Sequence, residues 1–125
     1  MTQPRALIIE DDDPIRMMLS TIVRHQGLSV DTARDGIEAI ENLDKDGYSV
    51  VLLDLMMPHV DGYAVLAHMR EHQPELLHRT ILATAVPQHD LDRNLKDPVY
   101  MIHSKPFDMQ QLIADVRHCA ELDAA

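Results

Sequence analysis

The sequence lacks several features on which whole classes of protein depend. It has one cysteine in 125 residues, Cys119, so no intrachain disulfide can form and a reducing cytoplasm is the expected compartment. A single thiol late in an amphipathic stretch is more often a packed side chain than a nucleophile. Apolar runs reach only four or five residues, and no charged-then-apolar leader opens the chain. We therefore expect neither a membrane span nor a signal peptide.

Positive charge is also scarce. There are 11 Lys and Arg residues against 21 Asp and Glu residues, which gives a net charge of −10 with neutral histidines. Such a chain repels nucleic acid and anionic membranes, and it favours cations or basic protein surfaces. The sequence shows no internal repeat, low-complexity segment or linker, and its length suits a single hydrophobic core. We expect residues 1–125 to form one domain that contacts neither DNA nor membrane directly.

Short apolar runs alternate along the chain with amphipathic stretches. The first helix is expected to begin at the cap residue Asp13, with Pro14 in its first turn, and to end before Gly27. Buried strands are predicted at residues 6–9, 28–33, 49–53, 80–83 and 99–103.

The later helices are predicted with uneven strength. Apolar positions at helical spacing indicate helices around residues 37–43 and 63–70, and a weaker fourth helix around 89–95. Asp108 and Gln111 have the spacing of a capping box for a last helix, whose apolar positions are Leu112, Ile113, Val116 and Cys119.

Five strand-then-helix units predict an α/β fold. The sheet is expected to be parallel with helices on both faces, because right-handed crossovers place a helix over the sheet at each step. In such sheets, ligands bind beyond the carboxyl ends of the strands. The polar residues predicted at those ends are Glu10 and Asp11 after the first strand, Asp54 after the third, Thr84 after the fourth and Ser104-Lys105-Pro106 after the fifth.

These side chains suggest a specific chemistry. Three carboxylates brought together repel one another unless a cation neutralises them, and oxygen ligands in an incomplete cage favour Mg²⁺, which keeps several waters and takes a phosphate oxygen. An aspartate such as Asp54 can attack phosphorus to form an acyl phosphate when cations offset the repulsion. Lys105 and Thr84 can then hold phosphoryl oxygens from fixed strand ends.

Taken together, four motifs resemble the response-regulator receiver domains of two-component signalling, and the resemblance covers nearly the whole chain. The motifs are Glu10-Asp11, Asp54 within the sequence DLMMP, Thr84-Ala85 and Lys105-Pro106-Phe107. The resemblance implies a flavodoxin-like doubly wound sheet of five strands in the order 2-1-3-4-5. Proline at position 98 implies that the fourth helix is short or irregular.

The resemblance also implies roles for individual residues. Asp54 is the expected phosphoacceptor and a metal ligand. Asp11 is expected to bind Mg²⁺ directly, the backbone carbonyl of Met56 to complete the protein's share of the coordination, and Glu10 to hold the metal through a water.

Two further residues of the resemblance face the phosphoryl group. Thr84 and Lys105 are expected to engage its oxygens, and the Lys105–Pro106 peptide bond is expected to be cis, a geometry that proline accepts at small cost.

By the same resemblance, the protein is a signalling switch and not a conventional enzyme: it catalyses only its own phosphorylation and dephosphorylation. The expected phosphodonor is a histidine kinase or a histidine phosphotransfer protein. The expected output is a downstream protein partner, or a homodimer through the face of the fourth helix, fifth strand and fifth helix. Because Met1 lies just before the first strand, we expect a stand-alone regulator without an output domain.

The sequence departs from the family at several positions. Ile102 stands where receivers usually carry an aromatic residue that reports phosphorylation, and Tyr100, two residues earlier, is expected on the same face of the strand but about 7 Å further along. We therefore expect Thr84 and the loop at 85–90 to carry the structural response. Met56 and Val86 are apolar where polar side chains could orient a water, which predicts slow hydrolysis of the acyl phosphate.

Two other functions compete with this interpretation. A pseudo-receiver that binds its partner without phosphorylation is favoured by Ile102 and disfavoured by the intact acidic pair, Asp54 and Lys105. An aspartyl-phosphate phosphatase, similar to the haloacid-dehalogenase family, needs a second aspartate two residues after Asp54, where this chain has Met56.

Some residues admit a metal or phosphodonor role but are expected to be ordinary. His68 and His72 lie one helical turn apart, as zinc ligands can, yet surface histidines are common on helices. His103 is expected to be a packed neutral histidine and not a phosphodonor. The methionines at positions 18, 56, 57 and 69 are expected to pack in the core or in loops.

Overall fold

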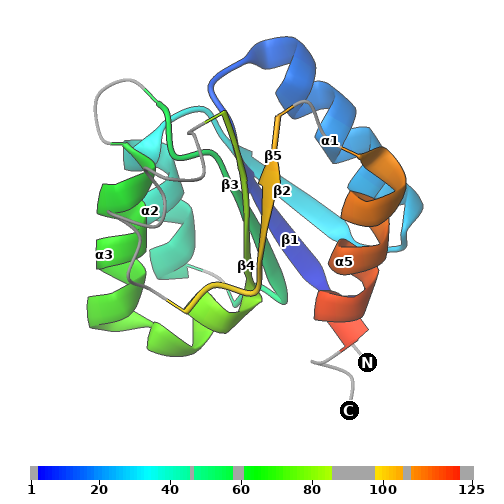
Figure 1. Ribbon diagram of the computed structural model, residues 1–125. Coiled ribbons are helices and arrows are strands. Elements are labelled where there is room, and N and C mark those ends of the chain that lie inside the picture. The colour runs from blue at the N-terminus through cyan, green and yellow to red at the C-terminus, as the bar shows by residue number, and fades with distance from the viewer. Residues whose placement is uncertain (1–2, 46, 58–60, 86–97, 106–107, 122–125) are drawn as a thin grey trace.

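Figure 1 shows the computed structural model, which describes residues 3–45, 47–57, 61–85, 98–105 and 108–121. Strands and helices alternate as the sequence predicts. The elements in chain order are β1 (Arg5–Ile9), α1 (Asp13–His25), β2 (Ser29–Ala33), α2 (Gly36–Lys45), β3 (Val50–Leu53), α3 (Gly62–His72), the 3₁₀ helix η1 (Pro74–Arg79), β4 (Thr80–Thr84), β5 (Met101–Ser104) and α5 (Met109–Glu121).

The sheet confirms the predicted topology. Its five strands are parallel and lie in the order β2-β1-β3-β4-β5. The chain starts in the middle at β1, moves outward to β2, and then returns across β1 to β3. The strand order therefore reverses between β1 and β3, and in doubly wound sheets a reversal of this kind opens a crevice at the carboxyl ends of the strands.

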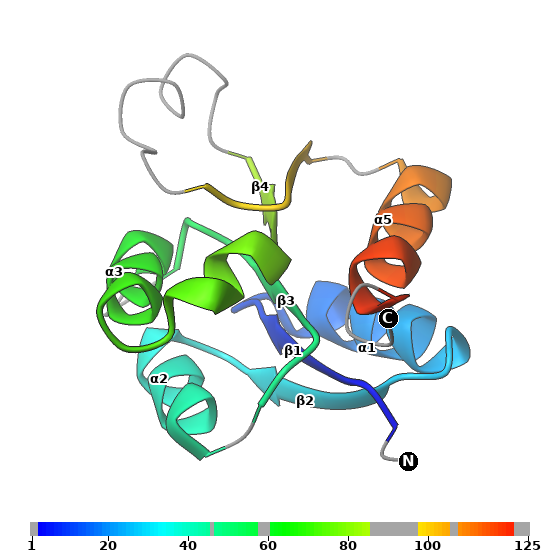
Figure 2. The same cartoon turned by 90° about the horizontal axis from the view of Figure 1, so that it is seen from below.

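Helices cover both faces of the sheet. Figures 1 and 2 show α1 and α5 on one face and α2 and α3 on the other. Successive side chains of a strand point to opposite faces, so β1 supplies Leu7 and Ile9 to the core cluster under α2 and α3, and Ala6 and Ile8 to the cluster under α1 and α5. Both clusters are buried, and this explains why the central strands are apolar without alternation.

The helix caps differ from the sequence prediction by one residue. Asp12, not Asp13, caps α1: its carboxylate accepts a hydrogen bond from the backbone N–H of Ile15 at 2.9 Å. Asp13 lies in the first turn instead, where it pairs with Arg16. Asp108 caps α5 as predicted, by accepting from the backbone N–H of Gln111 at 3.2 Å.

The fifth strand is shorter than predicted, and this changes the position of Tyr100. β5 begins at Met101, so Tyr100 lies in the bend before it. Ile102 packs against the cluster under α2 and α3, whereas Tyr100 packs against the opposite cluster, under α1 and α5. The expectation that the two residues share a face is therefore wrong, because the alternation of a strand does not extend through the bend.

Three other outcomes concern the chain between α3 and β5 and the chain as a whole. The 3₁₀ helix η1 after Pro74 was not predicted from the sequence. The predicted fourth helix around 89–95, and with it the face formed by helix four, lies outside the described residues. Within the described ranges, no helix is long and apolar enough to cross a membrane.

Candidate functional site

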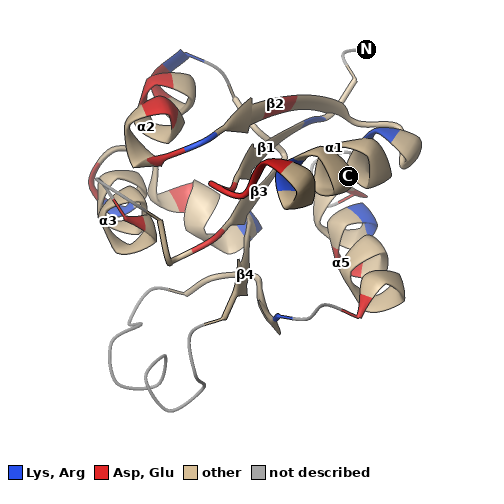
Figure 3. Cartoon of the chain, turned by 90° about the horizontal axis from the view of Figure 1, so that it is seen from above, with Lys and Arg blue, Asp and Glu red and all other residues tan. Residues whose placement is uncertain are grey.

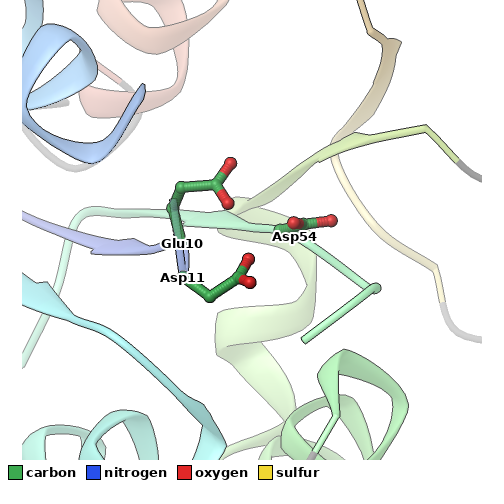
Figure 4. A group of neighbouring side chains, drawn as sticks. All are labelled: Glu10, Asp11 and Asp54. Carbon is green, nitrogen blue, oxygen red and sulfur yellow. The ribbon is translucent and has the colours of Figure 1, made fainter. Parts of the chain in front are cut away.

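Three carboxylates meet at the carboxyl ends of β1 and β3. Glu10 and Asp11 directly follow β1, and Asp54 directly follows β3. Figure 3 shows the acidic segment that leads into α1 beside the end of β3, and Figure 4 shows the three side chains as close neighbours. Each offers an oxygen, and these oxygens lie within 4.8 Å of one another. The sequence prediction that these residues converge is confirmed.

The backbone fixes two of the three carboxylates. Asp54 continues the sheet by donating its N–H to the carbonyl of Ile9 at 3.1 Å, and its Oδ1 accepts the N–H of Met56 at 3.0 Å. Glu10 likewise donates its N–H to the carbonyl of Ala33 at 3.0 Å. Glu10 is 2 % exposed and Asp54 is 4 % exposed, whereas Asp11 is exposed to solvent. Two buried carboxyl groups and one accessible carboxyl group thus lie together.

Lys105 is the cation of this group. It follows β5, and its backbone N–H donates to the carbonyl of Thr84 at 3.0 Å. Its Nζ donates to Oε1 of Glu10 at 2.9 Å and to Oδ2 of Asp54 at 3.3 Å. The shorter of these two bonds, to Glu10, was missed in the sequence analysis, because a strand end indicates which loop a residue occupies but not which carboxylate its side chain reaches.

Burial, hydrogen bonds and neighbouring charges shift the pKa values of Glu10 and Lys105. Loss of solvent raises the pKa of Glu10 from 4.5 to about 7; the hydrogen bond from Lys105 opposes this shift, and the negative charge of Asp54 adds to it. Burial by itself lowers the pKa of Lys105, but its hydrogen bonds to Glu10 and Asp54 and their charges outweigh burial, so its pKa is raised. Lys105 therefore carries its charge at neutral pH, while Glu10 is close to its titration midpoint.

A glycine allows the chain after Asp54 to approach the third helix. A Cβ on Gly62, the first residue of α3, would lie 2.5 Å from the Cα of Leu55 and 2.6 Å from the carbonyl oxygen of Asp54. The N–H of Gly62 donates to the carbonyl of Leu55 at 3.1 Å. The dipeptide Asp61-Gly62 was the available signal in the sequence for this close approach.

Comparison with known proteins identifies the family of this chain. Residues 6–117 match the response regulator receiver domain family. The chain belongs to that family. It is 32% identical over 115 residues to the transcriptional regulatory protein TrcR of Mycobacterium tuberculosis, a match that covers 90% of this chain and 44% of TrcR. The chain thus spans less than half the length of that relative.

Two further proteins match this chain over nearly their whole length. The sporulation initiation phosphotransferase F of Bacillus subtilis is 28% identical, and the match covers 90% of each chain. The solved structure of the BeF₃-activated DrrB receiver domain superimposes with a TM-score of 0.83 at 25% identity, covering 96% of this chain and 99% of that one. The fold of this receiver domain is therefore shared along nearly its whole length.

The acidic group of this receiver domain has the composition that Mg²⁺ prefers. All three side chains offer oxygen, Asp11 is accessible from solvent, and Glu10 and Asp54 share a single ammonium group, that of Lys105. A hard divalent cation with several retained waters suits a site of this kind, which supplies few protein ligands. Magnesium belongs to the chemistry of the family, and these residues fit it.

The remaining predicted site residues are placed at the same edge of the sheet. Thr84 ends β4 and is fully buried. Met56 lies just beyond Asp54 with 62 % of its surface exposed. Its role as a carbonyl ligand, and the role of Thr84 toward a phosphoryl oxygen, stay predictions. The predicted cis bond to Pro106 lies outside the described residues.

The alternative metal site on α3 finds no support in the structure. His68 and His72 stack with ring centroids 4.5 Å apart, and His68 Nε2 lies 3.0 Å from Oδ1 of Asp44. Among the described residues, however, Glu10, Asp11 and Asp54 form the only group of three or more suitable side chains within ligand distance.

Burial shows which of the remaining sulfur-containing side chains pack in the core. Cys119 is buried in the core as expected. Met69 is buried and Met57 is partly buried, but Met18 and Met56 are exposed, so the expectation of packed methionines holds only for the first pair.

Proposed function

We propose that Asp54 accepts a phosphoryl group from the phosphohistidine of a histidine kinase or histidine phosphotransfer protein, and that this event alters a surface that binds a downstream protein. The supporting observation is the position of the Asp54 carboxylate. An oxygen of this carboxylate lies within 4.8 Å of oxygens of Glu10 and Asp11, and its Oδ2 lies 3.3 Å from the ammonium of Lys105. Receiver domains as a family act as signalling switches of this kind.

The proposed transfer is a displacement at phosphorus. A carboxylate oxygen of Asp54 forms the new bond to phosphorus, the bond from phosphorus to the histidine nitrogen breaks, and the electron pair leaves with the imidazole. Bound Mg²⁺ would supply charge neutralisation for the phosphoryl oxygens, held by Asp11, Asp54 and the carbonyl of Met56, with Glu10 acting through a water.

The protein's own groups supply the rest. Lys105 is held at the end of β5 by its backbone bond to Thr84, so its ammonium needs little reorganisation to contact a phosphoryl oxygen. Burial of Asp54 at 4 % exposure limits the access of water to the acyl phosphate. We infer that residues 1–125 act as one receiver domain.

The test is phosphorylation of the purified chain. With acetyl phosphate and Mg²⁺, we expect intact mass to rise by one phosphoryl group in the wild type and in Asp44→Asn, a control on α2, but not in Asp54→Asn. Beryllofluoride with Mg²⁺ should change the elution volume or amide spectrum of the same two proteins. If the wild type stays unmodified while its fold is intact, the pseudo-receiver takes the place of this proposal. Repeated turnover of an organic phosphate would indicate a phosphatase.

A further inference from the structure

The strand that leads to Lys105, β5, has a strand neighbour on one side only. β5 is at the edge of the sheet and pairs only with β4. Of its four side chains, Met101 and Ser104 are exposed and Ile102 is half-buried, so His103 is the only buried one. We expect an edge strand of four residues with a single buried side chain to depend on that side chain for its position against α5.

His103 is tied to the middle of α5. Its Nε2 lies 2.7 Å from Oδ2 of Asp115, and the two side chains are 8 % and 10 % exposed. The tautomer of His103 decides the roles in this contact, and Nε2 donates when it carries the ring proton. The second carboxylate oxygen of Asp115 accepts from the side-chain amide of Gln111 at 3.2 Å. Both oxygens of a buried carboxylate are therefore satisfied.

The side chain of Gln111 does not take the position that the sequence predicts. The spacing of Asp108 and Gln111 predicts a capping box, in which the Gln111 side chain would return to the start of α5. The Gln111 side chain instead turns to Asp115, while its backbone N–H still donates to Asp108. Gln111 thus contributes to holding the acceptor of His103.

His103 precedes Lys105 by two residues, and only Ser104, the last residue of β5, separates them. The main chain between them is fixed to β4, where His103 is in register with Ala83 and Lys105 donates its N–H to Thr84. A displacement of His103 along α5 is therefore transferred to the ammonium of Lys105, whose contacts with Glu10 and Asp54 have lengths of 2.9 and 3.3 Å.

We propose that the His103–Asp115 hydrogen bond positions Lys105, by fixing β5 against α5 so that the ammonium stays between Glu10 and Asp54. The importance of Lys105 for phosphoryl transfer rests on the proposed function, but the placement of its ammonium can be measured without phosphorylation. A directional hydrogen bond fixes the register of strand and helix, whereas apolar side chains in the same place tolerate sliding.

The test separates position from stability. Removing one partner leaves a buried polar group unpaired, so the single variants His103→Val and Asp115→Leu should be destabilised. The double variant His103→Val/Asp115→Leu buries two apolar side chains and should unfold at nearly the wild-type urea concentration. His68→Val is the control, because it removes a contact of similar length, 3.0 Å to Asp44, from a more exposed place on the other face of the sheet.

Two readouts apply to each protein. The ¹⁵N and ¹H signals of the Lys105 ammonium, recorded without phosphodonor, should move toward the values of a solvated lysine in the double variant and stay unchanged in His68→Val. The rate of phosphorylation by acetyl phosphate should fall about tenfold in the double variant, as expected when a catalytic group is misplaced by a fraction of an ångström.

A further variant keeps the proposal open to refutation if the double variant does not fold. His103→Gln retains a donor for Asp115, and it should retain the wild-type Lys105 signal and rate to a greater extent than His103→Val. The proposal is wrong if the stable double variant keeps both the Lys105 signal and the rate, or if His103→Gln and His103→Val are alike in both. Failure of the wild type to become phosphorylated would instead count against the proposed function, and the Lys105 signal would still test the pair.

Discussion

Burial of Glu10 makes the stability of the metal-free protein fall as pH rises through neutrality. The pKa of Glu10 is raised from 4.5 to about 7, chiefly because its carboxyl is buried. The folded protein therefore keeps a proton that the unfolded chain has already lost. The stability that comes from this group is complete below pH 4.5 and is lost as pH rises through about 7.

The size of the effect follows from the difference between the two pKa values. At about 1.4 kcal/mol for each pH unit, a rise from 4.5 to about 7 corresponds to about 3 kcal/mol of unfolding free energy. Replacing Glu10 by Gln removes the titration and keeps both the size of the side chain and an oxygen that can accept from Lys105. Relative to wild type, we expect Glu10→Gln to be close to neutral near pH 4.5 and stabilising by about 3 kcal/mol above pH 7.

Urea unfolding, followed by circular dichroism across this pH range with a chelator present, measures the difference directly. Comparison with the variant cancels the titration of the other groups. Glu41→Gln, which removes an exposed carboxylate from α2, is the control and should give a small difference at every pH. A stability difference between wild type and Glu10→Gln that does not change with pH, or that favours wild type at high pH, would refute the reasoning.

Three other perturbations have defined outcomes. Gly62→Ala should cost about 1–3 kcal/mol and slow phosphorylation, because its Cβ would meet backbone at 2.5 Å, whereas Gly47→Ala has open space around it and should be nearly silent in urea unfolding. Lys105→Met should slow phosphorylation by acetyl phosphate about 10- to 100-fold, measured by intact mass against Lys45→Met; equal rates would exclude a role for the ammonium. Met56→Asn should shorten the lifetime of the acyl phosphate after removal of the phosphodonor, and an unchanged decay would contradict water exclusion.

The fold could be predicted from the sequence because each local signal agreed with the others. The apolar runs before Glu10 and Asp54 have the length and composition of buried parallel strands, and Gly27 follows the first helix with a φ of 92°, a conformation that glycine adopts readily. The carboxyl ends of parallel strands share one edge, so the position of a polar residue after a strand was sufficient to place it at the site.

Contacts between elements could not be predicted in the same way. The hydrogen bond from Lys105 to Glu10 joins residues that are 95 positions apart in the sequence, and the pairing of His103 with Asp115 joins a strand to a helix. Both depend on which face a side chain occupies and on the exact start of β5. The error at Tyr100 has this origin: β5 begins at Met101, two residues later than predicted, so Tyr100 packs in the cluster under α1 and α5, where burial and smaller electrostatic contributions from Cys119 and Asp115 raise its pKa.

The site contains more negative charge than its own lysine can neutralise. Glu10, Asp11 and Asp54 contribute three negative charges when ionised, and Lys105 returns one positive charge, so 3 − 1 leaves two to be balanced. A divalent cation matches that remainder, and a proton on Glu10 offers a partial substitute for it. Because both favour the same carboxylates, Mg²⁺ and the proton compete. Affinity for Mg²⁺ should therefore rise with pH through about 7 in the wild type and much less in Glu10→Gln, and isothermal titration in two buffers of different ionisation enthalpy should detect a proton released on binding. Release of no proton at neutral pH would mean that Glu10 is already ionised before the metal arrives.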